Sequence, residues 1–568
     1  MSLNTSHIVP ALREEVWAWH SRPGAVARLN PPFYPLTPIT QTTDLAKGTT
    51  VFALPAGLKW EARHDLSGYV KGFRFTDVCV SAPIRALATW RHSHSFMSIE
   101  VNGVPATKVT DEVHTRLPQS SLAPMFAYRQ QQLIHDISAM QRFQQFSDHP
   151  FTVAITGSRG LVGRALAAQL TTLGHKVIQL VRTTPKKRQR RWDPQSPAAD
   201  LLAGVDVLVH LAGEPIMGRF TDAHKQALWD SRVGPTAKLA ELVAKSPQCD
   251  TMISASAIGV YSFNRGDEIL TESSEAGEGF LAELSQAWEA DCEAAVSAGK
   301  RVVNLRTGVV MSGRGGMLPL LRTLFSTGLG GQFHDGTAWF SWIALDDLTD
   351  IIITAAVDSS LSGPINAVSP NPIHNSEMVR TLGKQLHRPA RFPIPNLGPR
   401  ILLGSQGAEE FVLADQRVLP ATLLKRGHVF RYRQFAAAVA HELGYEQLFD
   451  APEVDIAAMP LPEVESESAP SRWWRFPGFG RDEVYSVGTK RVVWASRLSC
   501  GSTTASVVFM PSGVVWVMVM FLRSASLTLM ARTGVVLVGV KSASFLPPMV
   551  PNQRPSVMGV RLPSVLRR

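Results

Sequence analysis

Three glycines at a fixed spacing are the residues of this 568-residue chain whose arrangement most clearly predicts chemistry. Gly157, Gly160 and Gly163 follow a short run rich in β-branched residues and precede a helical pattern at 164–173. In such a unit the first glycine permits a tight turn, the second lets the backbone approach a diphosphate, and the third lets the helix pack against the strand. Free N–H groups at the start of the helix then bind the diphosphate. The predicted dinucleotide-binding loop comprises Gly157, Ser158, Arg159, Gly160, Leu161, Val162 and Gly163.

The end of the next predicted strand, at 176–181, favours NADP(H) over NAD(H) as the dinucleotide. An NAD site usually has an acidic residue there for the ribose hydroxyls, whereas an NADP site has an arginine or lysine for the 2′-phosphate. Arg182 and the basic stretch 183–188 follow the strand, and the first acidic residue is Asp193. We therefore expect Arg182 to contact the 2′-phosphate. NAD(H) as the cofactor and a merely solvated basic loop are the alternatives.

Two more buried strands are predicted, and each should place residues at the carboxyl edge of the sheet, beside the glycine loop. Ligands of open α/β sheets bind at that edge, beyond the carboxyl ends of the strands. The segment 204–215 ends in a loop with small residues that would leave room for the adenosine side of the cofactor, at Leu211, Ala212 and Gly213. The segment 251–261 presents two serines and a tyrosine, Ser254, Ser256 and Tyr261. Ser256 and Tyr261 are the catalytic candidates.

The elements that must position these residues predict an α/β fold. Strand and helix patterns alternate from 151 to about 358, which is typical of a Rossmann-type doubly wound parallel sheet with helices on both faces. Residues before 147 instead combine a helical pattern at 10–20, several alternating strand-like runs and a long helical pattern at 123–146. The predicted parts are an α+β domain at 1–147, the dinucleotide-binding domain at 151–370, a smaller C-terminal substrate lobe at 371–450, an acidic linker at 451–470 and a basic tail at 471–568.

The first domain resembles the helix-grip fold of the SRPBCC superfamily, in which an opening helix, an antiparallel sheet and a long closing helix follow one another. The stretch VWAWHSRPGA at 16–25 is similar to the opening helix of that superfamily. The resemblance implies a cavity between the sheet and the long helix that holds an apolar ligand. His92 and His94 share one face of a predicted strand and could ligate a metal, but no third ligand is evident in the sequence. We therefore expect a histidine pair on the sheet surface and no metal.

From about 152 to 445 the chain resembles the atypical extended short-chain dehydrogenase/reductases described as epimerase family proteins or predicted nucleoside-diphosphate-sugar epimerases. The resemblance implies an NAD(P)-binding Rossmann domain, a family-specific C-terminal domain of unknown function that begins near 387, and a catalytic serine at Ser256. The motifs that carry it are TGSRGLVG at 156–163, HLAGEP at 210–215, SASAIGVY at 254–261, LRTGVV at 305–310, GLGG at 328–331, WIALDD at 342–347, NAVSP at 366–370 and HRPA at 387–390.

The sequence departs from this family's pattern in a way that concerns catalysis. Typical extended members pair the serine with a Tyr-x-x-x-Lys motif, whose lysine lowers the pKa of the tyrosine so that it acts as a general base. None of the seven tyrosines here is followed by lysine four residues later, and counting back from Glu289 places Leu281 and Ser285 at the two positions. Tyr261, with Arg265 four residues on, is a substitute acid/base pair. The alternative is a tyrosine that caps the strand edge.

Two acidic residues, Asp346 and Asp347, precede a helical pattern at 348–356. Asp at the start of a helix commonly caps its free N–H groups, so we expect one of them to cap this helix. Contact with a substrate is the alternative.

The charge distribution argues against nucleic acid as a partner. The formal net charge is +10, but residues 472–568 hold 13 of the 57 basic residues and two of the 47 acidic ones, so the rest of the chain is nearly neutral. The four cysteines form no C-x-x-C pair, and no secretory signal is visible, so we expect a cytoplasmic protein. Residues 505–522 are uncharged and just long enough to span a membrane. A tail without an evolved fold is the favoured interpretation of this region.

Three functions are open from the sequence. The favoured one is an NADP(H)-dependent oxidoreductase or epimerase for a small polar metabolite, such as a nucleotide sugar, in which Ser256 orients the substrate oxygen. The second, which the missing Tyr/Lys pair supports, is a non-catalytic NADP(H)-binding sensor or scaffold coupled to an apolar-ligand-binding first domain. In the third, the first domain is the main functional site and carries or cyclises an apolar ligand.

Overall fold

The computed structural model describes residues 2–147, 149–333, 335–390, 394 and 397–448, together with three short strands in the tail. The chain forms two compact units, Met1–Pro477 and Gly478–Arg568. The strands of the second unit form an antiparallel sheet of β21 (Ala495–Cys500), β22 (Thr503–Phe509) and β23 (Val515–Met520). The predicted linker at 451–470 and the rest of the tail lie outside the described residues. Among the described residues, no helix has the length and apolar character that a membrane span requires.

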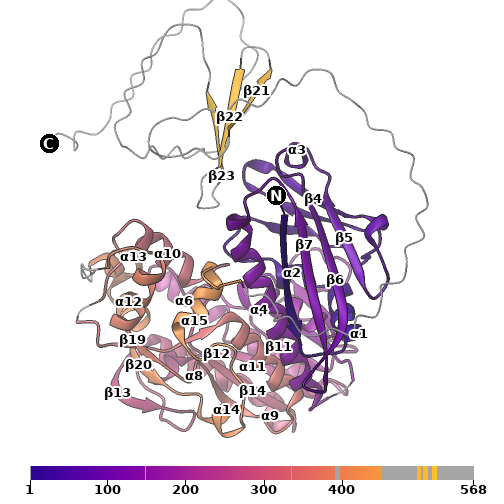
Figure 1. The fold of residues 1–568 in the computed structure, drawn as a ribbon. Coiled ribbons are helices and arrows are strands. Elements are labelled where there is room, and N and C mark those ends of the chain that lie inside the picture. Colours follow the sequence, from indigo (N-terminus) through magenta and orange to yellow (C-terminus); the bar gives the residue numbers. More distant parts are fainter. Residues whose placement is uncertain are drawn as a thin grey trace, which may run out of the picture. The chain divides into compact units, whose positions relative to one another are not determined.

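The larger unit begins with a seven-stranded antiparallel sheet in the order β1–β7–β6–β5–β4–β3–β2 (Figure 1). Two helices pack against this sheet, α1 (Arg13–Ser21) on β6 and β7, and the long α4 (Gln119–Gln144) on β1. The short α2 (Ala25–Leu29) follows α1 and contacts α4 and α5 (Leu161–Thr172), and the short α3 (Ile84–Ala88) connects β5 to β6. The strands are β1 (Ser2–Val9), β2 (Thr37–Thr40), β3 (Thr49–Ala53), β4 (Lys59–His64), β5 (Arg74–Cys79), β6 (Arg91–Val101) and β7 (Val104–His114).

The predicted order of helix, antiparallel sheet and long helix is present, but the unpredicted strand β1 precedes it. Periodicity missed β1 because two of its four inward residues, Thr5 and His7, are polar although both are buried. Membership of the SRPBCC superfamily and the apolar ligand both stay predictions.

A parallel seven-stranded sheet follows, in the order β10–β9–β8–β11–β12–β14–β18 (Figure 1). The predicted doubly wound sheet is thus confirmed, and its order reverses between β8 and β11, where such sheets open a crevice at their carboxyl edge. Its strands are β8 (Thr152–Thr156), β9 (Lys176–Val181), β10 (Gln189–Arg191), β11 (Val207–His210), β12 (Thr251–Ala257), β14 (Arg301–Thr307) and β18 (Gly363–Ala367). Its helices are α5 (Leu161–Thr172), α6 (Asp222–Asp230), α7 (Pro235–Lys245), α8 (Phe280–Ala290), α9 (Glu293–Ser297) and α11 (Leu345–Val357).

Short two-stranded sheets and helices form the smaller lobe beside the carboxyl edge. The paired strands are β13 (Asn264–Leu270) with β20 (Asp415–Val418), β15 (Val309–Met311) with β17 (Trp342–Ala344), and β16 (Trp339–Phe340) with β19 (Ile373–His374). The helices are α10 (Met317–Ser326), α12 (Asn375–Gln385), α13 (Leu397–Gly407), α14 (Ala421–Lys425) and α15 (Phe435–Leu443). A core that includes Trp342, Phe435 and Val439 ties the lobe together.

A buried cluster of charges joins the N-terminal domain to the parallel sheet and to the end of the described chain. Arg28 donates to both oxygens of Asp136 at 2.6 and 2.8 Å and to Asp346 at 2.7 Å. Arg431 pairs with Asp136 at 2.7 Å and donates to both oxygens of Asp350 at 2.7 Å. Because each guanidinium is buried against at least two carboxylates, removal of one side chain would leave charges without partners, at a cost of about 3–5 kcal/mol.

The cluster also changes the interpretation of the two acidic residues before α11. Neither Asp346 nor Asp347 caps the helix, which begins at Leu345 after the N-cap residue Ala344 and has no side-chain cap. Asp347 instead accepts hydrogen bonds from the backbone N–H groups of Arg431 and Tyr432 at 2.5 and 3.0 Å. Burial and the neighbouring Asp350 raise the pKa of Asp347 to about 7. The expectation of a helix cap is therefore wrong, because these carboxylates hold neighbouring segments of chain together.

Candidate functional site

The predicted glycine loop joins β8 to α5 in a conformation that needs glycine at two of its three positions. Gly157 has a φ of +64°, and a Cβ there would lie 2.6 Å from the carbonyl oxygen of Leu211. A Cβ at Gly163 would lie 2.4 Å from the carbonyl oxygen of Gly157 and 2.8 Å from the Cα of Ser158. The backbones of the loop, the first turn of α5 and the segment at Leu211 therefore lie so close together that a Cβ at Gly157 or Gly163 would clash with backbone atoms. This is the geometry that the spacing predicted.

The start of α5 offers a place for an anion. Gly160 begins the helix without a side-chain cap, so the first N–H groups keep their capacity to bind a ligand. Ser158 is 1% exposed, and its Oγ has no hydrogen-bond partner among the described residues. A buried hydroxyl without a partner is a group that a ligand oxygen can satisfy. Loop and hydroxyl together fit the diphosphate of a dinucleotide.

Two arginines stand at the corner where the ribose of such a cofactor would lie. Arg159 extends from the glycine loop, and its Nη2 donates to Oγ1 of Thr183 at 2.8 Å, just beyond the end of β9. Arg182, the predicted 2′-phosphate contact, is exposed and directly precedes Thr183 in the sequence. Exposed guanidinium groups are suited to bidentate contact with a phosphate.

The loop after β11 lies directly against the glycine loop. Oγ1 of Thr156, at the end of β8, accepts from the backbone N–H groups of Leu211 and Ala212 at 3.0 and 3.2 Å. His210 is fully buried between Thr156 and Thr236, at 2.7 and 3.1 Å, and burial lowers its pKa to about 3. This neutral histidine fixes the two strand ends side by side. The structure thus brings Leu211 and Ala212 to the glycine loop, and the predicted role of 211–213 beside the adenosine stays a prediction.

Ser256 lies near the carboxyl end of β12, and its hydroxyl is oriented by a carboxylate. Its Oγ donates to Oε1 of Glu289 at 2.6 Å. Arg306, the register partner of Ser256 on β14, donates to both oxygens of Glu289 at 2.9 Å. Burial alone would lower the pKa of the Arg306 guanidinium, but Glu289 raises it above its ordinary value. The result is a fixed Ser–Glu–Arg chain.

Tyr261 lies beside the hydrogen-bonded series of Ser256, Glu289 and Arg306, but its hydroxyl is buried. It donates to Oδ1 of Asn366 at 2.7 Å and accepts from Nη1 of Arg306 at 2.9 Å. Burial raises the pKa of Tyr261, whereas a general base near neutral pH needs a lowered one. Arg265, its suggested partner, donates to the backbone carbonyl of Tyr261 at 3.0 Å and pairs with Glu268. The geometry favours the alternative interpretation, a tyrosine that closes the strand edge.

Glu289 and Arg306 are the site residues that sequence reasoning missed. Leu281, Ser285 and Glu289 follow at intervals of four on α8 and therefore share a face of the helix. Ser285, at the position of the usual lysine, donates to the carbonyl of Leu281 at 2.7 Å. The polar group that this face presents to Ser256 is thus one turn further along, at Glu289. The four-residue spacing of Leu281, Ser285 and Glu289 was the sequence signal that could have identified Glu289 as a site residue.

Comparison with known proteins agrees with this geometry. The NAD dependent epimerase/dehydratase family matches residues 153–366, and a domain of unknown function, DUF1731, matches residues 394–442. An epimerase family protein from Mycobacterium bovis is 39% identical over 293 residues, which are 51% of this chain and 96% of that protein. A chloroplastic epimerase family protein homolog from Arabidopsis thaliana is 34% identical over 296 residues, which are 50% of this chain and 84% of the relative.

A solved structure extends the similarity beyond this segment. The crystal structure of the nucleoside-diphosphate sugar epimerase from Corynebacterium glutamicum is 59% identical, with a TM-score of 0.71, and the match covers 79% of this chain and 91% of that one. The residues from 151 to the end make up less than three quarters of the chain, so the match includes part of the N-terminal domain. Because this chain covers 96% of a relative that is 39% identical to it, it belongs to the NAD dependent epimerase/dehydratase family, with a C-terminal DUF1731 domain.

Proposed function

We propose that this protein binds NADP(H) and uses it in an oxidoreductase or epimerase reaction on a small polar metabolite of the nucleotide-sugar class. The observation that carries the proposal is the backbone cradle at 157–163, which lies at the edge where β9 delivers Arg182 and β12 delivers Ser256. The 59% identical Corynebacterium glutamicum protein is described as a nucleoside-diphosphate sugar epimerase, and this supports the substrate class.

The preference for NADP(H) rests on the corner beyond β9. A 2′-phosphate there would meet Arg159 and Arg182, and no acidic residue occurs between the strand and Asp193. An NAD ribose would lack the carboxylate that usually accepts from its hydroxyls.

The role of Ser256 follows from its neighbour. When bound, the nicotinamide ring supplies the hydride donor or acceptor. Because Ser256 directs its own proton to Glu289, the lone pairs of its Oγ are left to accept a hydrogen bond from a substrate hydroxyl. Glu289 is a positioning residue that fixes this polarity, and Arg306 fixes Glu289. Ser256 thereby orients a substrate oxygen for hydride transfer at its carbon.

Titration of the purified protein with NADPH and NADH, followed by cofactor fluorescence, tests the assignment. We expect tighter binding of NADPH, and Arg182→Ser should raise the Kd for NADPH about 10- to 150-fold, since a charge-assisted hydrogen bond contributes about 1.5–3 kcal/mol. The Kd for NADH should not change. Lys176→Ser removes the same charge from the exposed opposite end of β9 and serves as the matched control. Equal affinity of the wild-type protein for NADPH and NADH would contradict the NADP(H) assignment.

A further inference from the structure

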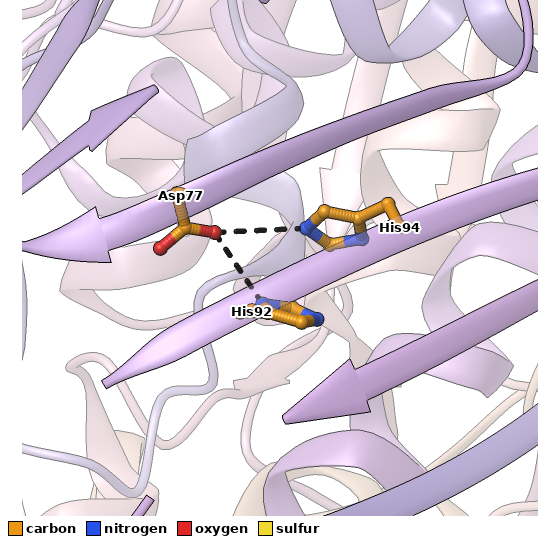
Figure 2. Close-up of side chains that lie close together, drawn as sticks. All are labelled: Asp77, His92 and His94. Carbon is orange, nitrogen blue, oxygen red and sulfur yellow. Dashed lines mark ion pairs between the residues drawn. The ribbon is translucent and has the colours of Figure 1, made fainter. Parts of the chain in front are cut away.

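Three side chains converge on the inner face of the N-terminal antiparallel sheet (Figure 2). Asp77 on β5 and His92 on β6 are register partners, and His94 is two residues further along the same face of β6. One nitrogen or oxygen atom from each side chain lies within 4.8 Å of the other two. Both histidines are 4% exposed, so they are not the sheet-surface pair expected from the sequence. The third group that the sequence did not reveal is Asp77.

Asp111 on β7 determines which ring nitrogens are free. Its Oδ1 lies 2.8 Å from Nε2 of His92 and 2.8 Å from Nδ1 of His94. A carboxylate oxygen only accepts hydrogen bonds, so these two nitrogens carry the protons. In neutral rings, Nδ1 of His92 and Nε2 of His94 then present lone pairs. These face Oδ2 of Asp77 at 3.5 and 3.8 Å.

This arrangement places three acceptors together with no donor between them. A bound cation would satisfy all three atoms at once.

We propose that Asp77, His92 and His94 bind a divalent first-row transition metal ion of the Zn²⁺ type. Metal–ligand bonds of about 2.0–2.2 Å in a tetrahedral site put ligand atoms roughly 3.3–3.5 Å apart. The two distances to Oδ2 of Asp77, 3.5 and 3.8 Å, require only a small contraction, and the two ring nitrogens lie within 4.8 Å of each other. Imidazole is a preferred ligand of such ions, and two imidazoles with one carboxylate leave a fourth position for water or a further ligand.

The neighbouring groups are those that support a metal site. Metal-bound histidines usually donate their other N–H to a carboxylate, and Asp111 occupies that position for both rings. Nε1 of Trp90 donates to Oδ1 of Asp77 at 3.1 Å, which leaves Oδ2 for the ion. Phe75 stacks on His94 with ring centroids 4.3 Å apart and helps to exclude water. The Asp77 side chain is 15% exposed and gives a hydrated ion a route of entry.

His7 is a further buried polar group on the inner face of this sheet. It is 1% exposed, and neither of its ring nitrogens has a hydrogen-bond partner among the described residues. It lies on β1, two residues from the register partner of Asp111, and therefore on the same face of the sheet. Buried polar groups of this kind are normally satisfied by water or a ligand.

The test uses the full-length protein, stripped with a chelator and then titrated with Zn²⁺ or Co²⁺. We expect one ion per chain by elemental analysis after dialysis, and Co²⁺ should give the visible absorption of a four-coordinate site. Asp77→Asn keeps the size of the side chain but removes the charged ligand. It should weaken Zn²⁺ binding by more than about 100-fold, since loss of an outer partner alone costs about 10–100-fold.

Asp65→Asn is the matched control, because Asp65 is in the same domain and its carboxylate pairs with Arg91 outside the site. Its Zn²⁺ affinity should equal that of the wild-type protein. Wild-type protein that binds neither ion at micromolar concentrations, or unchanged affinity in Asp77→Asn, overturns the proposal. Should Asp77→Asn fail to fold, X-ray absorption at the zinc edge of the wild-type protein decides: two imidazole ligands support the site, and a shell without imidazole overturns it.

Discussion

Replacement of Gly163 by alanine is expected to weaken NADP(H) binding while the protein stays folded. The added Cβ would lie 2.4 Å from the carbonyl oxygen of Gly157 and 2.8 Å from the Cα of Ser158. Both obstacles are backbone atoms, so no side-chain rotation relieves the contact. Since non-bonded carbon contacts are most favourable at about 3.5–4.0 Å, α5 and the loop must separate by roughly 1 Å.

The expected change in the Kd for NADPH follows from what this separation does to the N–H groups of the backbone cradle at 157–163. A displacement of about 1 Å moves the N–H groups of the helix start out of hydrogen-bond range of a phosphate oxygen, and each such charge-assisted bond contributes about 1.5–3 kcal/mol. Loss of one bond raises the Kd about 10- to 150-fold. The overpacking itself should cost about 1–3 kcal/mol of folding free energy.

The assay is an NADPH titration of the wild-type, Gly163→Ala and Gly204→Ala proteins, each with a urea unfolding curve. Gly204 is the control because its φ of +67° resembles that of Gly157, yet nothing lies within 4 Å of an added Cβ. Gly204→Ala should therefore lower stability by about 1–2 kcal/mol through backbone strain and leave the Kd unchanged. An NADPH Kd for Gly163→Ala within twofold of wild type would refute the close approach of helix and loop as the basis of binding.

Three further changes have defined outcomes. Arg28→Met leaves two buried aspartates without this partner and should lower the free energy of unfolding in urea by about 3–5 kcal/mol; a loss below 1 kcal/mol contradicts the network. Because the folded-state pKa of Asp347 is raised to about 7, the stability that it contributes is complete below its unfolded pKa near 4 and is lost as the pH rises through 7. Asp347→Asn should remove that loss, up to about 4 kcal/mol, and parallel stability curves for both proteins between pH 4 and 8 would contradict the raised pKa. Ser256→Ala should retain NADPH affinity and lower turnover of an active nucleotide sugar by about 100-fold, and unchanged turnover removes Ser256 from the reaction.

The parallel sheet could be predicted because its strands are buried on both faces. Val153, Ala154 and Ile155 on β8 are fully buried, so their strand is a short apolar run bounded by turn residues. In the N-terminal sheet the inner face mixes apolar residues such as Phe96 and Val109 with buried polar ones. The polar inward residues of β1, Thr5 and His7, therefore weaken the alternation from which a strand is predicted.

The parts of the two candidate sites also differ in how far the sequence could predict them. The glycine loop is local, since all three glycines lie within seven residues, and its spacing alone predicts the turn. The groups around Ser256 and His92 depend on strand register instead. Ser256 meets Arg306 across β12 and β14, and His92 meets Asp77 across β5 and β6. No spacing in the sequence gives these registers, which follow from how the strands pair in the folded sheet.

The N-terminal domain and the domain of the parallel sheet are joined by one buried cluster of charges. Asp136 on α4 reaches Arg431, and Arg431 holds Asp350 on α11. Gln169, near the end of the cofactor helix α5, donates to Oδ1 of Asp350 at 2.5 Å. The helix that begins at the cradle thus ends against the residues that anchor the N-terminal domain. Because separation would part Arg28 from Asp346 and Arg431 from Asp136, we expect the two domains to unfold as a single cooperative unit. We expect this although the Mycobacterium bovis relative matches only 293 residues, 51% of this chain.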